Sequence, residues 1–372
     1  MTDTTQKNKL TLAPCVHGGT LVEAQETFGK VLDFSANFNP LSFPNLERLL
    51  SLSLSSVNAY PDNRYRRFRE AVADYLNVDP NVVVPGNGSL ELIRNVTSAI
   101  LSSGDKVVIP APTFDEYEYA CALCGAEVTL LPIWSIDGFI NELEAVLSKE
   151  NIKMVFLCNP NNPTGRLLKR NQISKIADSC SEKGTALFVD EVFIELSDPS
   201  QSAIYVDYDN IFVLRSLTKS FSIPGLRVGY GLAPYSLSST LNCLRVPWNL
   251  NSIAAVVTPH LLSDCENYLK TSRNIIARER RWLKEKLGEI SGIHPLKSDA
   301  SFIMVDSSAT GLSSAELAVK MLTCGFLIRD CSSFKLTDNN YIRLAVRLRD
   351  DNQKLLNNLE KVAAKDNNCK NA

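Results

Sequence analysis

Apolar runs of strand length alternate with amphipathic segments through most of the chain. In Tyr65–Leu76, for example, Phe68, Val72 and Tyr75 recur on one face, which is the spacing of a helix. Shorter apolar runs without that spacing indicate buried strands. Such strands are expected at Val82–Pro85, Lys106–Ile109, Val128–Leu131, Met154–Leu157, Ala186–Glu191, Ile211–Leu214 and Val228–Leu232. Strands that alternate with helices in this way predict an α/β fold.

The pattern changes after the segment Pro247–Asn249. A long helical pattern, charged in its middle, runs from Ile253 to about Leu287, and a smaller α+β unit follows it. The elements expected in that unit are strand Phe302–Val305, helix Ser314–Cys324, strand Phe326–Arg329, strand Tyr341–Val346 and a closing helix from Asp351. We therefore place a domain boundary here.

The N-terminal part begins with a polar arm. A predicted helix, Leu21–Phe28, and an extended run, Leu32–Pro40, follow the arm. We expect residues 1–40 to form an arm and a segment associated with the small domain. Residues 41–247 should form the large domain and residues 248–372 the small C-terminal domain.

Composition narrows the class of protein. A chain of 372 residues with 45% apolar content can bury a sizeable core, and a net charge of −2 gives no footprint for nucleic acid or an anionic membrane. No apolar run approaches the ~20 residues that span a bilayer. Because the N-terminus lacks the apolar core of a signal peptide, we expect a cytoplasmic enzyme. The ten cysteines indicate reduced core residues, and with three histidines no metal site is expected.

The stretch Ser216–Arg227 holds the strongest candidate chemistry. Lys219 lies just past a buried strand end, where desolvation and nearby positive charge lower the pKa of an amine and make it nucleophilic. The hydroxyls of Ser216 and Thr218 can hold a phosphate, and Arg227 adds a fixed cation. This combination suits a lysine that carries a phosphorylated aldehyde as a Schiff base. The alternative is a surface lysine in a polar loop.

Three strand ends place further polar or aromatic side chains nearby. Asp190 ends a buried strand, where it needs a cation such as a protonated pyridine nitrogen, or else caps the next segment. Two Asn–Pro steps in Asn159–Gly165 predict a tightly defined loop, in which a side-chain amide such as that of Asn162 can hydrogen-bond a ring hydroxyl. Phe114 either stacks on a flat ring or caps the core.

Three segments are candidates for anion binding. Gly86, Asn87 and Gly88 open a helix, where free N–H groups and the helix dipole favour a phosphate. His17–Gly19 precedes a predicted helix and either binds an anion in the same way or forms a simple turn. Arg343 and Arg347 fall on one face of a predicted strand and either grip carboxylate or phosphate oxygens or are solvated charges.

Together these segments resemble the fold type I family of pyridoxal-5′-phosphate enzymes, aminotransferase class I/II, over nearly the whole chain and in the family's motif order. The resemblance implies a mostly parallel sheet sandwiched by helices, plus a smaller α+β C-terminal domain. It also implies a homodimer with shared active sites. It makes Lys219 the Schiff-base lysine, Asp190 the partner of the pyridine nitrogen and Asn162 that of the ring hydroxyl. The other cofactor contacts that it implies are Phe114, Gly86, Asn87, Gly88, Ser216, Thr218, Arg227 and, from the neighbouring subunit, Tyr60.

The two ends of the chain indicate the branch of the family. His17–Gly19, Asp33–Leu41, Ile328–Phe334 and Tyr341–Arg347 are similar to the L-threonine-O-3-phosphate decarboxylases of cobalamin biosynthesis, relatives of the histidinol-phosphate aminotransferases. The substrate contacts implied are His17, Gly18, Gly19, Asn37, Arg343 and Arg347. Phe193 stands where many aminotransferases carry a tyrosine that bonds the ring hydroxyl. The loop Ser333–Leu336 lacks a glycine that this resemblance leads us to expect.

We therefore expect decarboxylation of an amino-acid O-phosphate. The reaction would convert L-threonine O-3-phosphate to (R)-1-amino-2-propanol O-2-phosphate, or L-serine O-phosphate to ethanolamine phosphate. One alternative is an aminotransferase for histidinol phosphate or an aromatic amino acid. The other is the effector domain of a regulator, which is disfavoured because no helix-turn-helix or basic segment precedes the domain.

Overall fold

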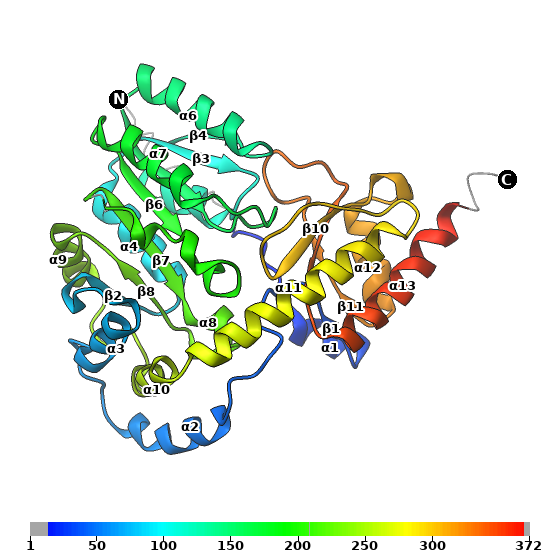
Figure 1. The fold of residues 1–372 in the computed structure, drawn as a ribbon, viewed down its shortest axis with the longest axis horizontal. Helices are drawn as coiled ribbons and strands as arrows, with labels where there is room; N and C mark the ends of the chain where they lie inside the picture. The colour runs from blue at the N-terminus through cyan, green and yellow to red at the C-terminus, as the bar shows by residue number, and fades with distance from the viewer. Residues whose placement is uncertain (1–13, 208, 368–372) are drawn as a thin grey trace, which may run out of the picture.

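The computed structural model describes residues 14–207 and 209–367, and a seven-stranded sheet forms its larger part (Figure 1). The strand order is β2-β8-β7-β6-β5-β3-β4; β8 runs antiparallel to both of its neighbours, β2 and β7, and the other pairings are parallel. The strands in chain order are β2 (Val83–Gly86), β3 (Lys106–Ala111), β4 (Glu127–Pro132), β5 (Ile152–Cys158), β6 (Ala186–Asp190), β7 (Ile211–Ser216) and β8 (Gly229–Leu232).

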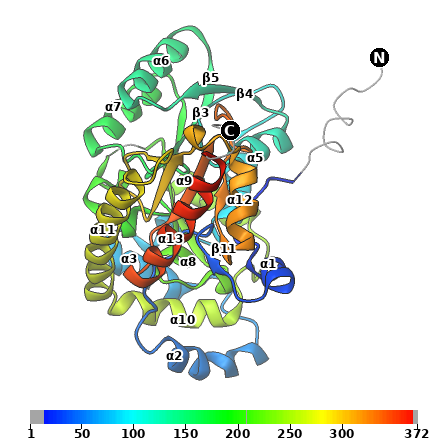
Figure 2. The same ribbon diagram turned by 90° about the vertical axis from the view of Figure 1, so that its right-hand side faces the viewer.

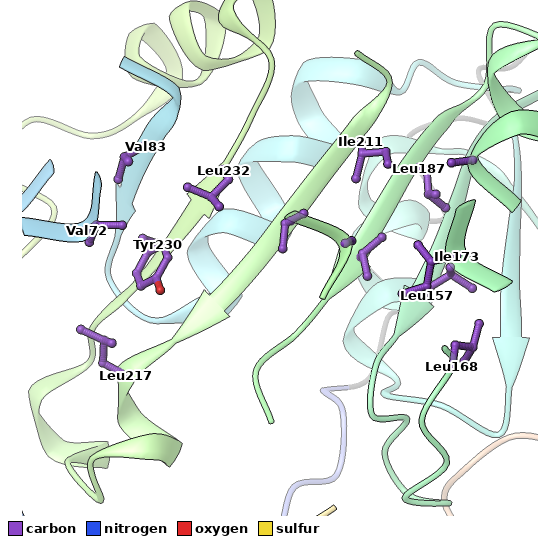
Figure 3. Packing of buried hydrophobic residues seen from close by; sticks show 14 of the residues in the cluster. Val72, Val83, Leu157, Leu168, Ile173, Leu187, Ile211, Leu217, Tyr230 and Leu232 are labelled. Carbon is purple, nitrogen blue, oxygen red and sulfur yellow. The ribbon is translucent and has the colours of Figure 1, made fainter. Parts of the chain in front are cut away.

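Helices cover both faces of this sheet because the strands are apolar on both sides. In β5, Val155 and Leu157 pack against one layer of helices, while Met154 and Phe156 pack against the other. Figure 3 shows part of the first core. The first layer contains α3 (Arg66–Leu76), α6 (Ile136–Lys149), α7 (Arg170–Ser181) and α10 (Ser252–Ser263). The second contains α4 (Ser89–Ile100), α5 (Glu116–Cys124) and α9 (Tyr235–Leu244).

A smaller antiparallel sheet has the strand order β12-β13-β10-β9. The N-terminal strand β1 (Leu32–Asp33) instead pairs in parallel with β11 (Phe326–Leu327). The small sheet contains β9 (His294–Pro295), β10 (Phe302–Asp306), β12 (Arg329–Asp330) and β13 (Tyr341–Ala345). Around these strands lie α1 (Leu21–Phe28), α11 (Glu266–Gly288), α12 (Ser314–Thr323) and α13 (Arg349–Asn367) (Figure 2). The domain boundaries proposed near residues 40 and 247 stay predictions.

Several elements differ from those predicted. The long helical pattern from Ile253 to about Leu287 forms two helices: α10 and α11 are separated at Asp264, whose φ of −143° and ψ of 40° are not helical. The proline of this region, Pro259, lies inside α10 rather than at the break. Most of the extended run that ends at Pro40 is loop, because only β1 pairs. Helix α2 (Leu46–Ser53), beside α10 in Figure 2, was not predicted.

The loop Ser333–Leu336, in which a glycine was expected, ends in a residue with a strained backbone. Leu336 adopts a φ of +57°, the left-handed region that glycine occupies at little cost.

Within the part of the chain that the structure describes, no helix has the length and apolar character needed to cross a membrane.

Candidate active site

A cavity of about 230 Å³ lies at the carboxyl ends of the parallel strands. This is the edge at which ligands bind in open α/β sheets. The structure brings many of the predicted site residues to its wall: Lys219, Asp190, Asn162, Phe114, Thr218, Arg227, His17, Gly18, Gly19, Asn37 and Arg343. Segments more than 300 residues apart in sequence therefore share one site.

Lys219 is presented by the short helix α8 (Leu217–Ser220), which follows β7 directly. Burial, together with the charges of Arg343 and Arg227, lowers the pKa of its amine from 10.5 to about 8, as the sequence led us to expect. Its Nζ lies 4.4 Å from the centre of the Phe38 ring. The lowered pKa gives this amine a larger unprotonated fraction near neutral pH than an ordinary lysine has, and a nucleophile requires the unprotonated form.

Asp190 ends β6 and is buried with neutral partners. The hydroxyl of the fully buried Tyr117 donates to Oδ2 at 2.6 Å, and the Val192 N–H donates to Oδ1 at 2.9 Å. Burial raises the pKa of Asp190 to about 6, although both hydrogen bonds favour its ionised form. No cationic side chain of the described residues forms an ion pair with this carboxylate.

The second carboxylate of the Asp-Glu pair turns away from the cavity. Glu191 accepts from Arg215 Nε at 2.9 Å and from Ser202 Oγ at 2.6 Å. Arg215 also donates to Glu195, so a buried ion network ties β6 to β7 beside the site. Only the first acid of the pair is therefore available to a ligand in the cavity.

The N-terminus of α4 forms a cationic cradle with Arg227. Gly88 has a φ of +75°, and a Cβ added there would lie 2.3 Å from Nη2 of Arg227. Only a glycine therefore lets this guanidinium approach the helix end closely. The positive end of a helix next to an arginine is a site for a phosphate.

The N–H groups of Asn87 and Gly88 are not free to bind a phosphate, contrary to the prediction. The Asn87 N–H already donates to Oε2 of Glu91 at 2.5 Å, and the Gly88 N–H donates to the Gly86 carbonyl at 2.8 Å. Gly86, Asn87 and Gly88 do not line the cavity, whereas Ser89 and Leu90, the first residues of α4, do. Ser89 and Leu90 were not among the predicted contacts, which ended at Gly88.

Arg343 links several of the predicted substrate contacts. Its Nη1 donates to Asn162 Oδ1, and its Nη2 donates to the Ser35 carbonyl at 2.7 Å. The Asn37 amide, in the orientation that satisfies both groups, accepts from Nη1 and Nε at 3.2 Å. Burial lowers the pKa of Arg343 to about 10. Among the described residues, the acceptors of this guanidinium are thus neutral.

Arg329 also lines the cavity, although it was not among the predicted site residues. It lies directly opposite Arg343 in the β12–β13 pairing, and its side chain donates to the Val16 carbonyl and Ser333 Oγ, each at 2.9 Å. The available signal was an arginine that ends an apolar strand. Tyr117 was missed as well, although it follows Phe114 by one helical turn.

Besides Gly86, Asn87 and Gly88, three further predicted residues lie away from the cavity wall. Tyr60 is 78% exposed, stacks on Trp248 with ring centres 4.5 Å apart, and lines a different cavity. Arg347 follows the end of β13, where its side chain binds the Asp33 carbonyl at 3.0 Å and Asp351 at 3.2 Å. Ser216 is buried behind the cavity wall, 2.8 Å from Thr218 Oγ1. Their roles stay predictions.

The cavity wall fits pyridoxal phosphate in the chemistry of its groups. That cofactor presents a pyridine nitrogen, an aldehyde and a phosphate. The wall offers a buried acid with neutral partners, an amine of lowered pKa, and an arginine at a helix N-terminus, namely Asp190, Lys219 and Arg227.

Comparison with known proteins identifies the family. The model of "Aminotransferase class I and II" matches residues 29–359. Histidinol-phosphate aminotransferase 2 of Archaeoglobus fulgidus is 33% identical over 334 residues, which are 90% of this chain and 93% of the relative. A Caldanaerobacter subterraneus protein provisionally named threonine-phosphate decarboxylase is 34% identical over 352 residues, 93% of each chain.

Two solved structures agree with these relatives. Histidinol-phosphate aminotransferase from Clostridium acetobutylicum superposes with a TM-score of 0.82 at 29% identity, covering 90% of this chain and all of that one. L-threonine-O-3-phosphate decarboxylase from Porphyromonas gingivalis superposes with a TM-score of 0.79 at 25% identity, covering 89% and 99%.

The chain belongs to the aminotransferase class I and II family. It has the fold type I architecture, so the predicted fold class is confirmed. The family consists of pyridoxal-phosphate-dependent enzymes, so the predicted cofactor is confirmed as well.

Proposed function

We propose that this enzyme decarboxylates an amino-acid O-phosphate, with O-phospho-L-threonine or O-phospho-L-serine as substrate. The observation that carries this proposal is the pair Arg329 and Arg343. Both are register partners on adjacent strands, both line the cavity, and they are only 6% and 5% exposed. Among the described residues neither forms an ion pair with a carboxylate. Adjacent buried cations are costly unless a ligand supplies anions.

An amino-acid O-phosphate supplies both anionic groups. Arg343 is held among amide and carbonyl acceptors beside Asn162, which suits the planar carboxylate at Cα. Arg329 holds the Val16 carbonyl next to His17, which suits the phosphate. Ligand oxygens at both guanidinium groups would fix the substrate at two ends and so fix the rotation about its reacting carbon.

Pyridoxal phosphate would be held by the residues of the cavity wall whose chemistry matches its groups. Asp190, kept in place by Tyr117, would pair with the pyridine nitrogen, and Lys219 would carry the aldehyde. Arg227, Thr218 and the first N–H groups of α4 would bind the phosphate. When bound, pyridoxal phosphate acts as an electron sink that stabilises negative charge at Cα after a bond to that carbon breaks.

The residues of the chain then decide which bond breaks. Arg343 would orient the carboxylate so that its bond to Cα is the one that breaks, and CO₂ leaves. Lys219, with an amine pKa of about 8, can hold a proton at Nζ near neutral pH and deliver it to Cα. Phe193, which lines the cavity and packs edge-on against Phe302, offers no phenol to the ring hydroxyl. This departure favours the decarboxylase over a typical aminotransferase.

A second candidate is a histidinol-phosphate aminotransferase. Similar relatives from Methanosphaera stadtmanae and Methanosarcina mazei carry that name, as does the Archaeoglobus fulgidus relative. The same two arginines would suit a substrate phosphate in one half-reaction and the carboxylates of an acidic amino donor in the other.

One experiment separates the two candidates. The purified enzyme, loaded with pyridoxal phosphate, is incubated with O-phospho-L-threonine, with O-phospho-L-serine, and with histidinol phosphate plus 2-oxoglutarate. We expect CO₂ and an amino-alcohol phosphate from the phospho-amino acids, and at most trace glutamate from the third mixture. Glutamate formation without CO₂ release would establish the aminotransferase instead. A role in cobalamin synthesis stays a prediction.

We also propose that the enzyme is a homodimer with shared active sites. Members of this family are typically dimers. An exposed apolar surface runs from α2 through η2 (Leu54–Asn58) to α10 and the segment before it. We call this the α2–α10 face; its exposed apolar residues are Leu52, Leu54, Val57, Tyr60, Val246, Trp248 and Val256. Exposed apolar residues gathered on neighbouring elements, as α10 lies against α2 and η2, are typical of a subunit interface.

A further inference from the structure

Glu116, in the first turn of α5, is a buried carboxylate that binds two cationic side chains. It is 5% exposed. His17 Nε2 lies 2.9 Å from its Oε1, and Arg94 Nη2 lies 2.7 Å from its Oε2. The hydrogen bond from His17, together with that from Arg94, holds the pKa of Glu116 below its ordinary value. An ionised carboxylate only accepts hydrogen bonds, so His17 donates its Nε2–H to Glu116.

The segment Val16–Gly19 is fixed at several further points. Arg329 donates to the Val16 carbonyl at 2.9 Å, and the Gly19 N–H donates to Ser35 Oγ at 2.9 Å. A Cβ on Gly18 would lie 2.8 Å from the Ser35 carbonyl oxygen, so this glycine packs closely. All four residues of the segment line the cavity. The segment thus connects α5 to the buried arginine of β12.

We propose that Glu116 is a positioning residue for recognition of the substrate phosphate, acting through His17. This inference rests on the proposed function and describes how the same site distinguishes phosphorylated substrates. Glu116 itself need not touch the ligand. It anchors the imidazole ring at Nε2 and thereby leaves Nδ1 as the ring nitrogen available to a phosphate oxygen.

The chemistry of the ring explains why the anchor must be charged. A phosphate oxygen accepts hydrogen bonds, so it requires a proton on Nδ1, and the ring then carries protons on both nitrogens and a positive charge. Glu116 stabilises that charge directly. The other titratable groups near Glu116 and His17 are Arg94 of α4, Asp115, which precedes α5, Glu118 of α5, Arg329 of β12, Lys335 and the Cys15 thiol. Asp115 and Cys15 provide no second anchor, since no hydrogen bond joins either of them to His17 among the described residues.

The test compares Glu116→Gln with a matched control, Glu118→Gln, in the same first turn of α5. A glutamine keeps the size of the side chain but loses its charge, and its amide NH2 group would face one of the two donors, His17 or Arg94. For the holoenzyme acting on O-phospho-L-threonine, we expect Glu116→Gln to raise KM by about tenfold or more, with kcat within about twofold of the parent. The dissociation constant of pyridoxal phosphate should stay unchanged. Glu118→Gln should match the parent in all three measurements.

A binding measurement separates this inference from the proposed reaction. Inorganic phosphate is titrated calorimetrically into the parent holoenzyme, Glu116→Gln and His17→Ala, without any turnover. Weaker phosphate binding by both variants supports the inference even if the enzyme proves to be an aminotransferase. Three results would overturn it: no phosphate binding by the parent, unchanged binding by Glu116→Gln, or a Glu116→Gln enzyme that loses kcat and cofactor affinity while KM stays constant.

Discussion

At the scale of single residues, the amine of Lys219 illustrates how function costs stability. Burial and the charges of Arg343 and Arg227 hold its native pKa near 8, whereas the unfolded chain restores a value near 10.5. Below pH 8 the amine is protonated in both states, and the native state bears the full penalty of a buried charge. Between about pH 8 and 10.5 the unfolded state binds more protons, so this penalty disappears as the pH rises.

Replacing this lysine should therefore stabilise the apoenzyme. We expect Lys219→Met to raise the free energy of unfolding at pH 7 by about 1–3 kcal/mol, and the gain should diminish between pH 8 and 10.5. Urea unfolding of both apoproteins at one protein concentration, repeated across this pH range, measures the difference. Lys153→Met, an exposed lysine of β5, is the control and should show no such pH-dependent gain. A Lys219→Met apoenzyme less stable than its parent at pH 7 would contradict the assigned burial.

At the scale of elements, the entrance to α4 depends on one missing side chain. Gly88 combines a positive φ with the close approach of Arg227, so Gly88→Ala adds backbone strain and a steric clash with the guanidinium. We expect the dissociation constant of pyridoxal phosphate to rise at least about tenfold, measured by absorbance titration of the apoenzyme. Gly104→Ala is the matched control: φ is +85° there, but nothing lies within 4 Å of the added Cβ. Equal affinities of the two variants for pyridoxal phosphate would show that Arg227 does not help to bind the cofactor phosphate.

Strand ends could be predicted from sequence, whereas the register between strands could not. Lys219, Asp190 and Asn162 could be placed because each follows a buried strand, and parallel strands bring such ends to one edge. The pairing of Arg329 with Arg343 could not, since it depends on the register between two strands that local sequence does not encode. The contact of His17 with Glu116 spans 99 positions and depends on the path of an irregular segment. Helix ends without a glycine or proline, such as Asp264, were likewise missed.

At the scale of the whole molecule, the active site depends on chain segments from every part of the structure. The N-terminal strand β1 pairs with β11 beside the small sheet, and the segment Val16–Gly19 next to it binds α5 of the large sheet. Relative movement of the two sheets would therefore strain this segment. The site within one chain also lacks Tyr60, which stacks on Trp248 in the α2–α10 face.

If Tyr60 serves the site of the neighbouring subunit, two inactive variants should restore activity when mixed. Lys219→Ala lacks the amine, and Tyr60→Ala lacks the phenol; each homodimer should be strongly impaired. After unfolding and refolding a 1:1 mixture, half of the dimers pair one chain of each kind, and each such dimer holds one complete site. Activity should then reach about a quarter of the parent value, because the intact chain partners combine across the two-fold interface. Refolding each variant alone is the control. Activity no higher than the mean of the two variants would instead mean that Tyr60 acts within its own chain or not at all.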